Sequence, residues 1–240
     1  MKITKHHWLY KTKIAHRGLW NEEIPENSLP AYQNAVDNGY GIEIDVYKTT
    51  DGEIVLFHDS TLIRMTGVEG KIYEKTLKEL KSLRLNGTEN TIPTLKELLS
   101  TVDGKVPLLI EIKDQPDKSV VDDTVKILRD YKGDFALQSF NPLYINRVRK
   151  IAPDMIRGIL GTHNSKIFKG FKLFVLKNLP LNFLIKPQFI SYKFTGLPLK
   201  KRKKKNLPVL AWTITNKMDY KNVKGYCDNI IFENFIPEDY

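Results

Sequence analysis

The sequence predicts an α/β fold, a TIM (β/α)8 barrel with a short β-hairpin and loop insertion after the second strand. Apolar runs of strand length alternate with segments of helix length, which favours parallel strand pairing. The segment at residues 48–52 lies between the second and third runs, and the connection is too short for a parallel crossover, so this pair must be antiparallel. The length of 240 residues is close to the roughly 250 of a single barrel.

Nine apolar runs are expected to be strands, and removing the return strand of the hairpin leaves the eight that a barrel requires. The strands are expected at residues 13–16, 42–47, 54–57, 107–112, 135–138, 156–160, 189–192, 208–213 and 229–232. Helices are expected between most of them, at residues 28–38, 77–83, 94–100, 119–131, 142–151 and 167–178. A doubly wound open sheet is the alternative, but no glycine-rich turn of a dinucleotide site follows the first strand.

The region between residues 59 and 90 is long for a loop that joins a strand to a helix, and too small for an independent domain. It is expected to cover the mouth of the barrel. Residues 1–240 are therefore expected to form a single barrel domain.

Composition sets the broad class of the protein. Hydrophobic residues make up 41% and charged residues 28%, enough for a core and against general disorder. Cys227 is the only cysteine, so no intrachain disulfide forms. The start of the sequence has no apolar leader and no run is long enough to span a membrane, so a cytoplasmic location is expected. The net charge of +10 suits nucleic acid, anionic lipid or phosphorylated small molecules without choosing among them.

Acidic side chains interrupt two apolar strands. Because side chains alternate along a strand, Glu43 and Asp45 share one face of the run GIEIDV at residues 41–46. The run LLIEIK places Glu111 and Lys113 on one face in the same way. Unpaired in a barrel interior, such carboxylates would each cost on the order of several kcal/mol. Mg²⁺ or Ca²⁺, which prefer oxygen ligands, would remove this cost. Pairing with inward Lys or Arg side chains is the alternative.

Two histidines are expected near these carboxylates. His16 ends the first strand and is followed by Arg17, at the end of a strand where barrel sites are built. If the Asp-Gly dipeptide of the hairpin forms a two-residue turn, Asp45 lies opposite His58, with their Cβ atoms about 5 Å apart. Arg17 and Lys113 can hold phosphate oxygens, although Lys113 can instead neutralise a neighbouring carboxylate. Together these groups favour phosphodiester cleavage, with one His taking a proton and the other giving one.

The order and spacing of these motifs resemble the glycerophosphodiester phosphodiesterase family, densely over the first half of the chain and loosely over the second. The motifs are AHRG at 15–18, PENS at 25–28, EIDV at 43–46, TDG at 50–52, HD at 58–59, RMTG at 64–67, IPTL at 92–95, IEIK at 110–113, QSFNP at 138–142 and AWT at 211–213. The resemblance implies a TIM barrel. It also implies hydrolysis of glycerophosphodiesters to sn-glycerol 3-phosphate and an alcohol, in lipid and glycerol metabolism.

The resemblance also implies one divalent cation, a small-molecule phosphodiester substrate and a role for each site residue. Glu43, Asp45 and Glu111 would bind the cation, His16 and His58 would be the acid–base pair, Arg17 and Lys113 would contact the phosphate, and Trp212 would line the substrate pocket. Asn27 can serve the site or cap the following helix. The alternatives are a lysophospholipase-D-like activity on larger lipid diesters and, in another class, a non-catalytic anion- or membrane-binding barrel.

Two further segments are strongly basic. Residues 200–205 read KKRKKK, which suits a solvated loop or a nucleic-acid contact, but no nucleic-acid-binding motif accompanies them and no nucleic-acid partner is expected. Residues 166–186 mix lysines with Phe and Leu. That composition is typical of a helix that contacts an anionic membrane, and equally of an outer barrel helix that packs on the sheet.

Overall fold

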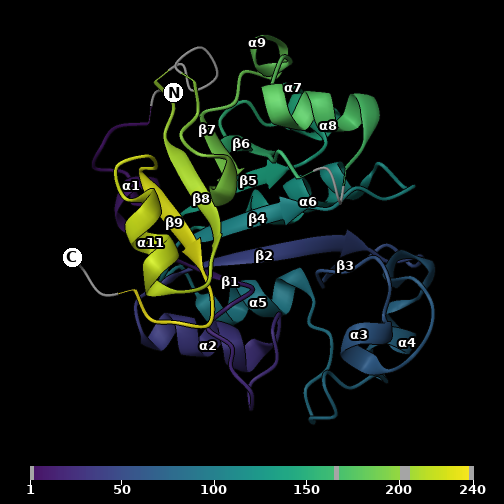
Figure 1. Cartoon of the computed structure of the whole chain (residues 1–240). Coiled ribbons are helices and arrows are strands. Elements are labelled where there is room, and N and C mark those ends of the chain that lie inside the picture. Colours follow the sequence, from purple (N-terminus) through teal and green to yellow (C-terminus); the bar gives the residue numbers. More distant parts are fainter. Residues whose placement is uncertain (1–2, 165–167, 201–205, 238–240) are drawn as a thin grey trace. The chain divides into compact units, whose positions relative to one another are not determined.

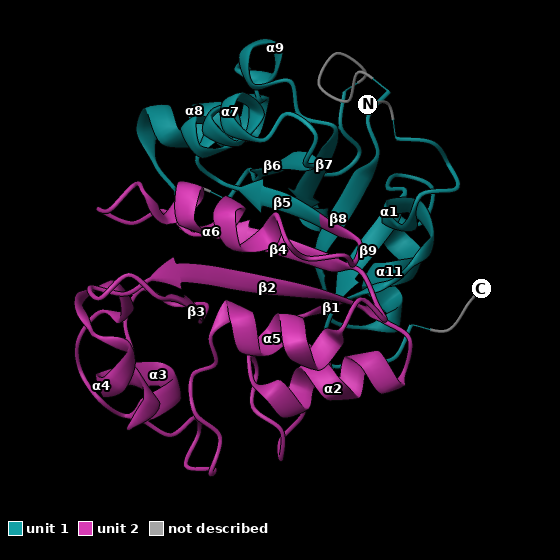
Figure 2. Cartoon of the chain, turned by 180° about the vertical axis from the view of Figure 1, so that it is seen from behind, with its two compact units in different colours: residues 1–14, 136–240 teal, residues 15–135 magenta. Residues whose placement is uncertain are grey.

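The computed structural model describes residues 3–164, 168–200 and 206–237 (Figure 1). Its contacts divide the chain into two units, shown in different colours in Figure 2. Unit 1 contains residues 1–14 and 136–240, and unit 2 contains residues 15–135. The basic run at 201–205 lies outside the described residues.

Unit 2 is built around a long strand that carries the acidic motif. This strand, β2 (Gly41–Lys48), pairs parallel with β4 (Leu108–Ile112) and antiparallel with β3 (Ile54–Leu56). The strand β1 (Ile14–His16) also pairs with β2. The predicted hairpin between the second and third runs is therefore confirmed.

The helices of unit 2 begin at capping residues that the sequence displays. The helices are α2 (Leu29–Asp37), α3 (Ile63–Thr66), η1 (Ile72–Glu74, a 3₁₀ helix), α4 (Leu77–Lys81), α5 (Leu95–Val102) and α6 (Val120–Leu128). Ser28 caps α2, while Thr76 and Thr94 form capping boxes with Glu79 and Glu97. Both α2 and α6 contact β2.

The insertion after β3 has a small hydrophobic core of its own. Tyr47, Val55 and Phe57 from the hairpin pack with buried residues of the insertion. The insertion contributes Leu62, Met65, Ile72, Leu80, Leu85 and Ile92. This packing fixes α3 against the hairpin, which matters for the site because α3 carries Arg64.

The hairpin register differs from the prediction by one residue. Lys48 pairs with Ile54, and the Phe57 amide donates to the Asp45 carbonyl, so Asp45 lies opposite Phe57 and not opposite His58. The Thr49 amide donates to the Glu53 carbonyl at 2.9 Å, and the Thr49 hydroxyl accepts from the Glu53 amide at 2.9 Å. These two residues close the loop, so its turn has three residues, 50–52. The expectation of a two-residue turn was therefore wrong.

Unit 1 contains five strands that pair in parallel in chain order. They are β5 (Phe135–Ser139), β6 (Arg157–Gly161), β7 (Phe189–Lys193), β8 (Val209–Ile214) and β9 (Asn229–Phe232). The helices are α1 (Trp8–Lys11), α7 (Pro142–Ile151), α8 (Gly170–Asn178), α9 (Asn182–Ile185), η2 (Phe194–Gly196) and α11 (Lys217–Val223).

All nine predicted strands are present, with ends within two residues of the prediction. The six predicted helices are present too, although α8 begins at Gly170. The short helices α1, α3, α9 and α11 were not predicted. The single-domain organisation stays a prediction. No helix in the described part of the chain is long and apolar enough to cross a membrane.

Candidate functional site

Three carboxylates meet between two neighbouring strands of unit 2. Glu43 and Asp45 are 2% and 0% exposed on β2. The parallel register of β2 and β4 pairs Asp45 with Glu111, which is 7% exposed. Oxygen atoms of the three side chains lie within 4.8 Å of one another. The structure thus brings together the three residues that the alternation pattern turns inward.

Lys113 lies between two of these carboxylates. Its Nζ is 3.1 Å from Asp45 Oδ1 and 3.1 Å from Glu111 Oε1. Burial alone would lower the pKa of Lys113, but the two carboxylates raise it, so the side chain stays cationic. The contact expected of a neutralising lysine is therefore present.

Lys113 and other nearby cations balance the negative charge of the three carboxylates only in part. Burial, together with repulsion from Asp45 and Glu111, raises the pKa of Glu43 well above its ordinary value. Burial also raises the pKa of Glu111, despite the attraction of Lys113. Burial alone would raise the pKa of Asp45, but nearby cations, Lys113 foremost, hold it below its usual range. Oxygen donors with surplus negative charge suit a hard divalent cation, so the residues present fit a metal site.

The chain turns sharply after β1 at Arg17 and Gly18. Their φ angles are 61° and 85°, in the left-handed region. A Cβ on Gly18 would lie 2.9 Å from the backbone of Ala31, so only glycine lets this loop approach α2. The turn directs the Arg17 amide toward Glu43 Oε2 at 3.4 Å and leaves Arg17 Nε 3.9 Å from Asp45 Oδ2.

Ion pairs link Arg17 to His58. Glu26 Oε1 accepts from Arg17 Nη1 at 2.7 Å, and both carboxylate oxygens of Glu26 accept from Arg64, at 2.7 and 2.9 Å. Arg64 Nε also donates to Asp59 Oδ2 at 2.5 Å, and Asp59 Oδ1 lies 2.6 Å from His58 Nδ1. The PENS, HD and RMTG motifs contain the three linking residues, but their spacing gives no sign of this contact. Sequence reasoning missed the network.

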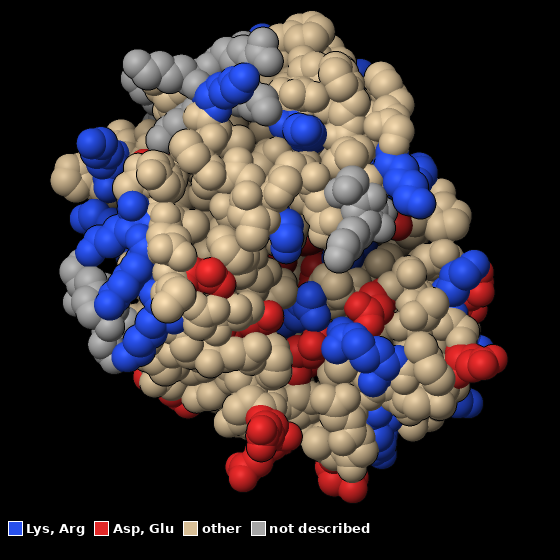
Figure 3. Space-filling view, in the orientation of Figure 1, with Lys and Arg blue, Asp and Glu red and all other residues tan. Residues whose placement is uncertain are grey.

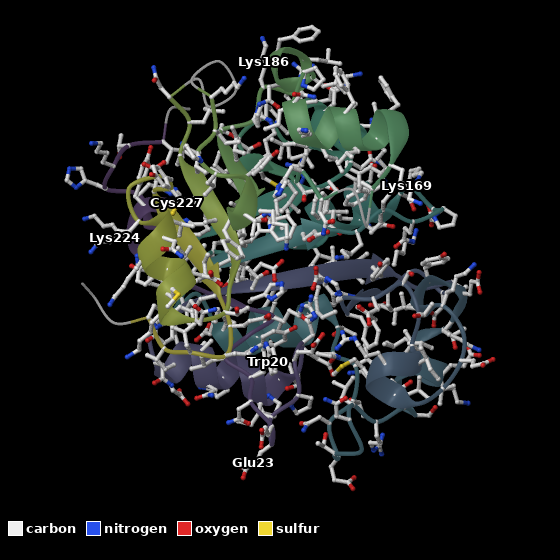
Figure 4. The ribbon with its side chains drawn as sticks, viewed as in Figure 1. Trp20, Glu23, Lys169, Lys186, Lys224 and Cys227 are labelled. Carbon is white, nitrogen blue, oxygen red and sulfur yellow. The ribbon has the colours of Figure 1, made fainter. Side chains whose placement is uncertain are left out.

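The two histidines stand near each other. The ring centroids of His16 and His58 are 6.4 Å apart, with the ring planes at 76°. The side chains are 13% and 33% exposed. His16 Nε2 lies 3.9 Å from Glu43 Oε2, and the His16 carbonyl accepts from Trp20 Nε1 at 3.0 Å (Trp20 is labelled in Figure 4). Although the predicted register was wrong, His58 still comes next to His16, because it follows the end of β3 by two residues.

Asn27 supports Asp45 and does not cap α2. Its Nδ2 donates to Asp45 Oδ2 at 3.3 Å, and its Oδ1 accepts from the Tyr32 hydroxyl at 3.0 Å. The cap is Ser28, whose Oγ accepts from the Ala31 amide. Of the two roles that the sequence left open for Asn27, contact with the site is the one observed.

Trp212 belongs to unit 1, on β8. Its ring packs edge to face with Phe140 at a centroid distance of 5.6 Å, and Lys193 Nζ lies 5.1 Å from the ring centroid. Trp212 Nε1 is buried and has no hydrogen-bond partner among the described residues. The predicted contact of Trp212 with substrate stays a prediction.

Comparison with known proteins identifies the family to which the chain belongs. The model of the glycerophosphoryl diester phosphodiesterase family matches residues 16–235. A glycerophosphodiester phosphodiesterase of Caldanaerobacter subterraneus subsp. tengcongensis is 30% identical, over 92% of this chain and 93% of its own length.

Solved structures show the same fold. A phosphodiesterase of Oleispira antarctica, solved in complex with the product sn-glycerol-3-phosphate, has a TM-score of 0.77 and 24% identity, over 93% of both chains. A glycerophosphodiester phosphodiesterase of Thermotoga maritima has a TM-score of 0.73 and 25% identity, over 92% of this chain and 94% of its own. The predicted TIM barrel is thereby confirmed. The chain belongs to the glycerophosphoryl diester phosphodiesterase family, and is a phosphoric diester hydrolase.

Proposed function

We propose that this protein hydrolyses glycerophosphodiesters to sn-glycerol 3-phosphate and an alcohol, with a divalent cation as cofactor. The observation that carries the proposal is one constellation in unit 2. Two imidazoles 6.4 Å apart stand beside three buried carboxylates whose oxygens lie within 4.8 Å. The names of the relatives, and the product bound to the Oleispira antarctica enzyme, support this substrate class.

Glu43, Asp45 and Glu111 would hold the cation. Their all-oxygen donor set favours Mg²⁺ or Ca²⁺ over zinc, which prefers nitrogen and sulfur ligands. When bound, the cation would stabilise the negative charge that develops on the non-bridging phosphate oxygens.

Arg17 and Lys113 would orient the phosphate. Glu26 holds one end of the Arg17 guanidinium at 2.7 Å, which fixes the plane of a group suited to bidentate contact with phosphate. Lys113 stays cationic between Asp45 and Glu111 and can turn a donor toward a phosphate oxygen. Both side chains would counter charge that grows as the phosphorus is attacked.

His16 and His58 would transfer the protons. One imidazole would take the proton of the attacking hydroxyl, and the other would give a proton to the oxygen of the departing alcohol. Donation from His58 Nδ1 to Asp59 Oδ1 would hold the His58 ring in place and leave proton transfer to Nε2.

The attacking hydroxyl is either water or the 2-hydroxyl of the glycerol. Attack by the 2-hydroxyl would release the alcohol and form a cyclic phosphate, which water would then open. A diester that lacks the 2-hydroxyl separates the two routes. Retained turnover of this substrate would assign direct attack by water, and lost turnover would assign the cyclic route.

Two finer assignments complete the proposal. Trp212 would contact the substrate, a role supported by the family motif AWT and by its buried Nε1, which lacks a partner in the described part of the chain. Lysolipid diesters are a second candidate substrate, favoured by the exposed phenylalanines of α8 and α9. The cytoplasmic location expected from the sequence stays a prediction.

A substrate panel tests the proposal. It comprises glycerophosphocholine, glycerophosphoethanolamine, glycerophosphoglycerol and lysolipids, each with chelator, Mg²⁺ or Ca²⁺. We expect cation-dependent release of sn-glycerol 3-phosphate from at least one glycerophosphodiester. Turnover of lysolipids alone would favour the lysophospholipase-D-like activity. Equal turnover with chelator would reject the cation.

A further inference from the structure

Helices α8 and α9 turn large apolar side chains outward. Phe171 and Phe174 on α8 are 80% and 53% exposed, and Phe183 and Leu184 on α9 are 69% and 43% exposed. Together with the exposed lysines on and beside these helices, these residues are called the α8–α9 surface below. The lysines are Lys169, Lys172, Lys177 and Lys186.

The outward direction of these side chains is fixed by buried residues on the same helices. Leu176 of α8 is buried, and Ile185 of α9 packs in a core cluster with Leu179. Phe171 and Phe174 are three residues apart on one side of α8, with their rings 6.3 Å apart and nearly parallel. An outer barrel helix would bury such a pair against the sheet. Here the pair faces away from the buried face, so packing on the sheet does not explain its composition.

The lysines around these aromatic residues have no acidic neighbours in the sequence. Residues 155–218 contain fourteen Lys or Arg residues and no Asp or Glu. Figure 4 labels Lys169 and Lys186 at the ends of the α8–α9 segment. In Figure 3 the charged side chains visible over α8 and α9 are blue, set among uncharged atoms. The surface therefore combines exposed aromatic rings with positive charge.

This combination matches one kind of partner, and we propose that the α8–α9 surface binds the face of an anionic lipid bilayer. Phenylalanine and leucine side chains would enter the boundary between headgroups and acyl chains, while the lysines contact anionic headgroups. A second copy of the chain fits less well, because pairing of two such surfaces would bring like charges together. The proposal is independent of the proposed reaction, since no catalytic residue lies on this surface.

Co-sedimentation with vesicles tests whether the α8–α9 surface binds an anionic bilayer. The full-length protein is mixed with phosphatidylcholine vesicles that contain increasing amounts of phosphatidylglycerol, at low and high salt. We expect binding that rises with phosphatidylglycerol and falls with salt. Phe171→Ser with Phe183→Ser should weaken binding at least about tenfold. Lys169→Gln with Lys186→Gln should weaken binding about 25-fold, or roughly fivefold per lysine.

An exposed apolar residue and an exposed lysine elsewhere in unit 1 provide the control for these substitutions. Met218 on α11 is 72% exposed, and the exposed Lys224 follows α11, away from α8 and α9 in Figure 4. Met218→Ser with Lys224→Gln should leave vesicle binding unchanged. All variants should keep the wild-type activity on a water-soluble diester, so that loss of binding is separated from loss of fold or of catalysis.

Three outcomes would overturn the proposal. The first is no binding of the wild type to anionic vesicles at low salt. The second is binding that the control pair weakens as much as the surface pairs do. The third is a protein mass in solution that rises with concentration and falls to the monomer in Phe171→Ser, which would assign the surface to a second copy.

Discussion

His58 Nδ1 lies 2.6 Å from Asp59 Oδ1, and this contact connects a proposed proton-transfer residue to a network of charged side chains. Asp59 is held in turn by Arg64, and Arg64 by the buried carboxylate of Glu26. Glu26 also binds Arg17. One network therefore orients both the imidazole and the guanidinium that the proposed reaction uses.

Asp59→Asn tests whether the carboxylate positions His58. We expect kcat to fall about tenfold to a hundredfold with little change in KM, because proton transfer depends on ring orientation. In a His58→Ala background the same change should cost nothing further, since the imidazole it orients is gone. Steady-state kinetics of the two single variants and the double variant measure this. Equal losses with and without His58 would show that Asp59 acts elsewhere.

Arg64→Gln should destabilise the fold in a pH-dependent way. Burial alone would raise the pKa of Glu26, but hydrogen bonds and charge from Arg64 and Arg17 hold it below its ordinary 4.5. A carboxyl with a lowered pKa stabilises the fold above its unfolded pKa and loses that contribution as the pH falls through its folded pKa. The variant should therefore lose about 1–2 kcal/mol near neutral pH, and less as the pH falls below 4.5.

Arg84→Gln is the matched control for this measurement. The Arg84 side chain is 47% exposed against 44% for Arg64, but its partner Glu89 is fully exposed, at 3.7 Å. Such a pair contributes little to stability. Urea unfolding across a pH series should show no change in this control. A loss in Arg64→Gln that stayed constant down to acidic pH would contradict the role assigned to Glu26.

The alternation of side chains along β2 and β4 was enough to predict that the three carboxylates point inward. Their apolar neighbours occupy the opposite face of each strand and pack on helices, so the acidic side chains must point inward. The sequence did not predict that Asp45 and Glu111 are register partners, since parallel register depends on the whole sheet. The predicted hairpin register was wrong by one residue because the Thr49 hydroxyl helps to close the loop. The Asp-Gly dipeptide alone gives no sign of this hydrogen bond.

Contacts between distant segments explain the remaining gaps in the prediction. Arg64 and Glu26 are brought together only when the insertion packs its own core on β3, and no local pattern signals that contact. The mixture of Lys and Phe in α8 and α9 likewise left two interpretations open. Which side of a short helix is buried depends on anchors such as Ile185, and the sequence of the helix alone did not identify them.

Divalent cations should stabilise the protein through the three carboxylates. At about 100 times Kd, binding to the native state adds roughly 2.7 kcal/mol, or about 5–10 °C in Tm for a chain of this size. Glu43→Gln should lose most of this shift because it removes a buried oxygen ligand. Glu69→Gln, an exposed position, should keep it. Thermal unfolding with chelator, Mg²⁺ and Ca²⁺ measures the shifts, and a full shift in Glu43→Gln would place the cation elsewhere.

Gly18→Ala should destabilise the loop that carries Arg17. The residue has φ 85°, and an added Cβ would lie 2.9 Å from the Ala31 backbone, so strain and overlap add to about 2–4 kcal/mol. Gly67→Ala is the control, because Gly67 has φ 72° but open space around it, and should cost only about 1 kcal/mol. Equal costs in urea unfolding would show that the approach to α2 does not require glycine.

The proposed mechanism is tested by comparing release of sn-glycerol 3-phosphate by the wild type and by His16→Ala, with saturating cation and after chelation. We predict cation-dependent release by the wild type and a loss of at least about a hundredfold in the variant, since general acid–base catalysis contributes this much or more. The cation-induced shift in Tm should survive in His16→Ala, which shows that the fold and the metal site are intact. Turnover of His16→Ala at the wild-type rate would contradict the proposed mechanism.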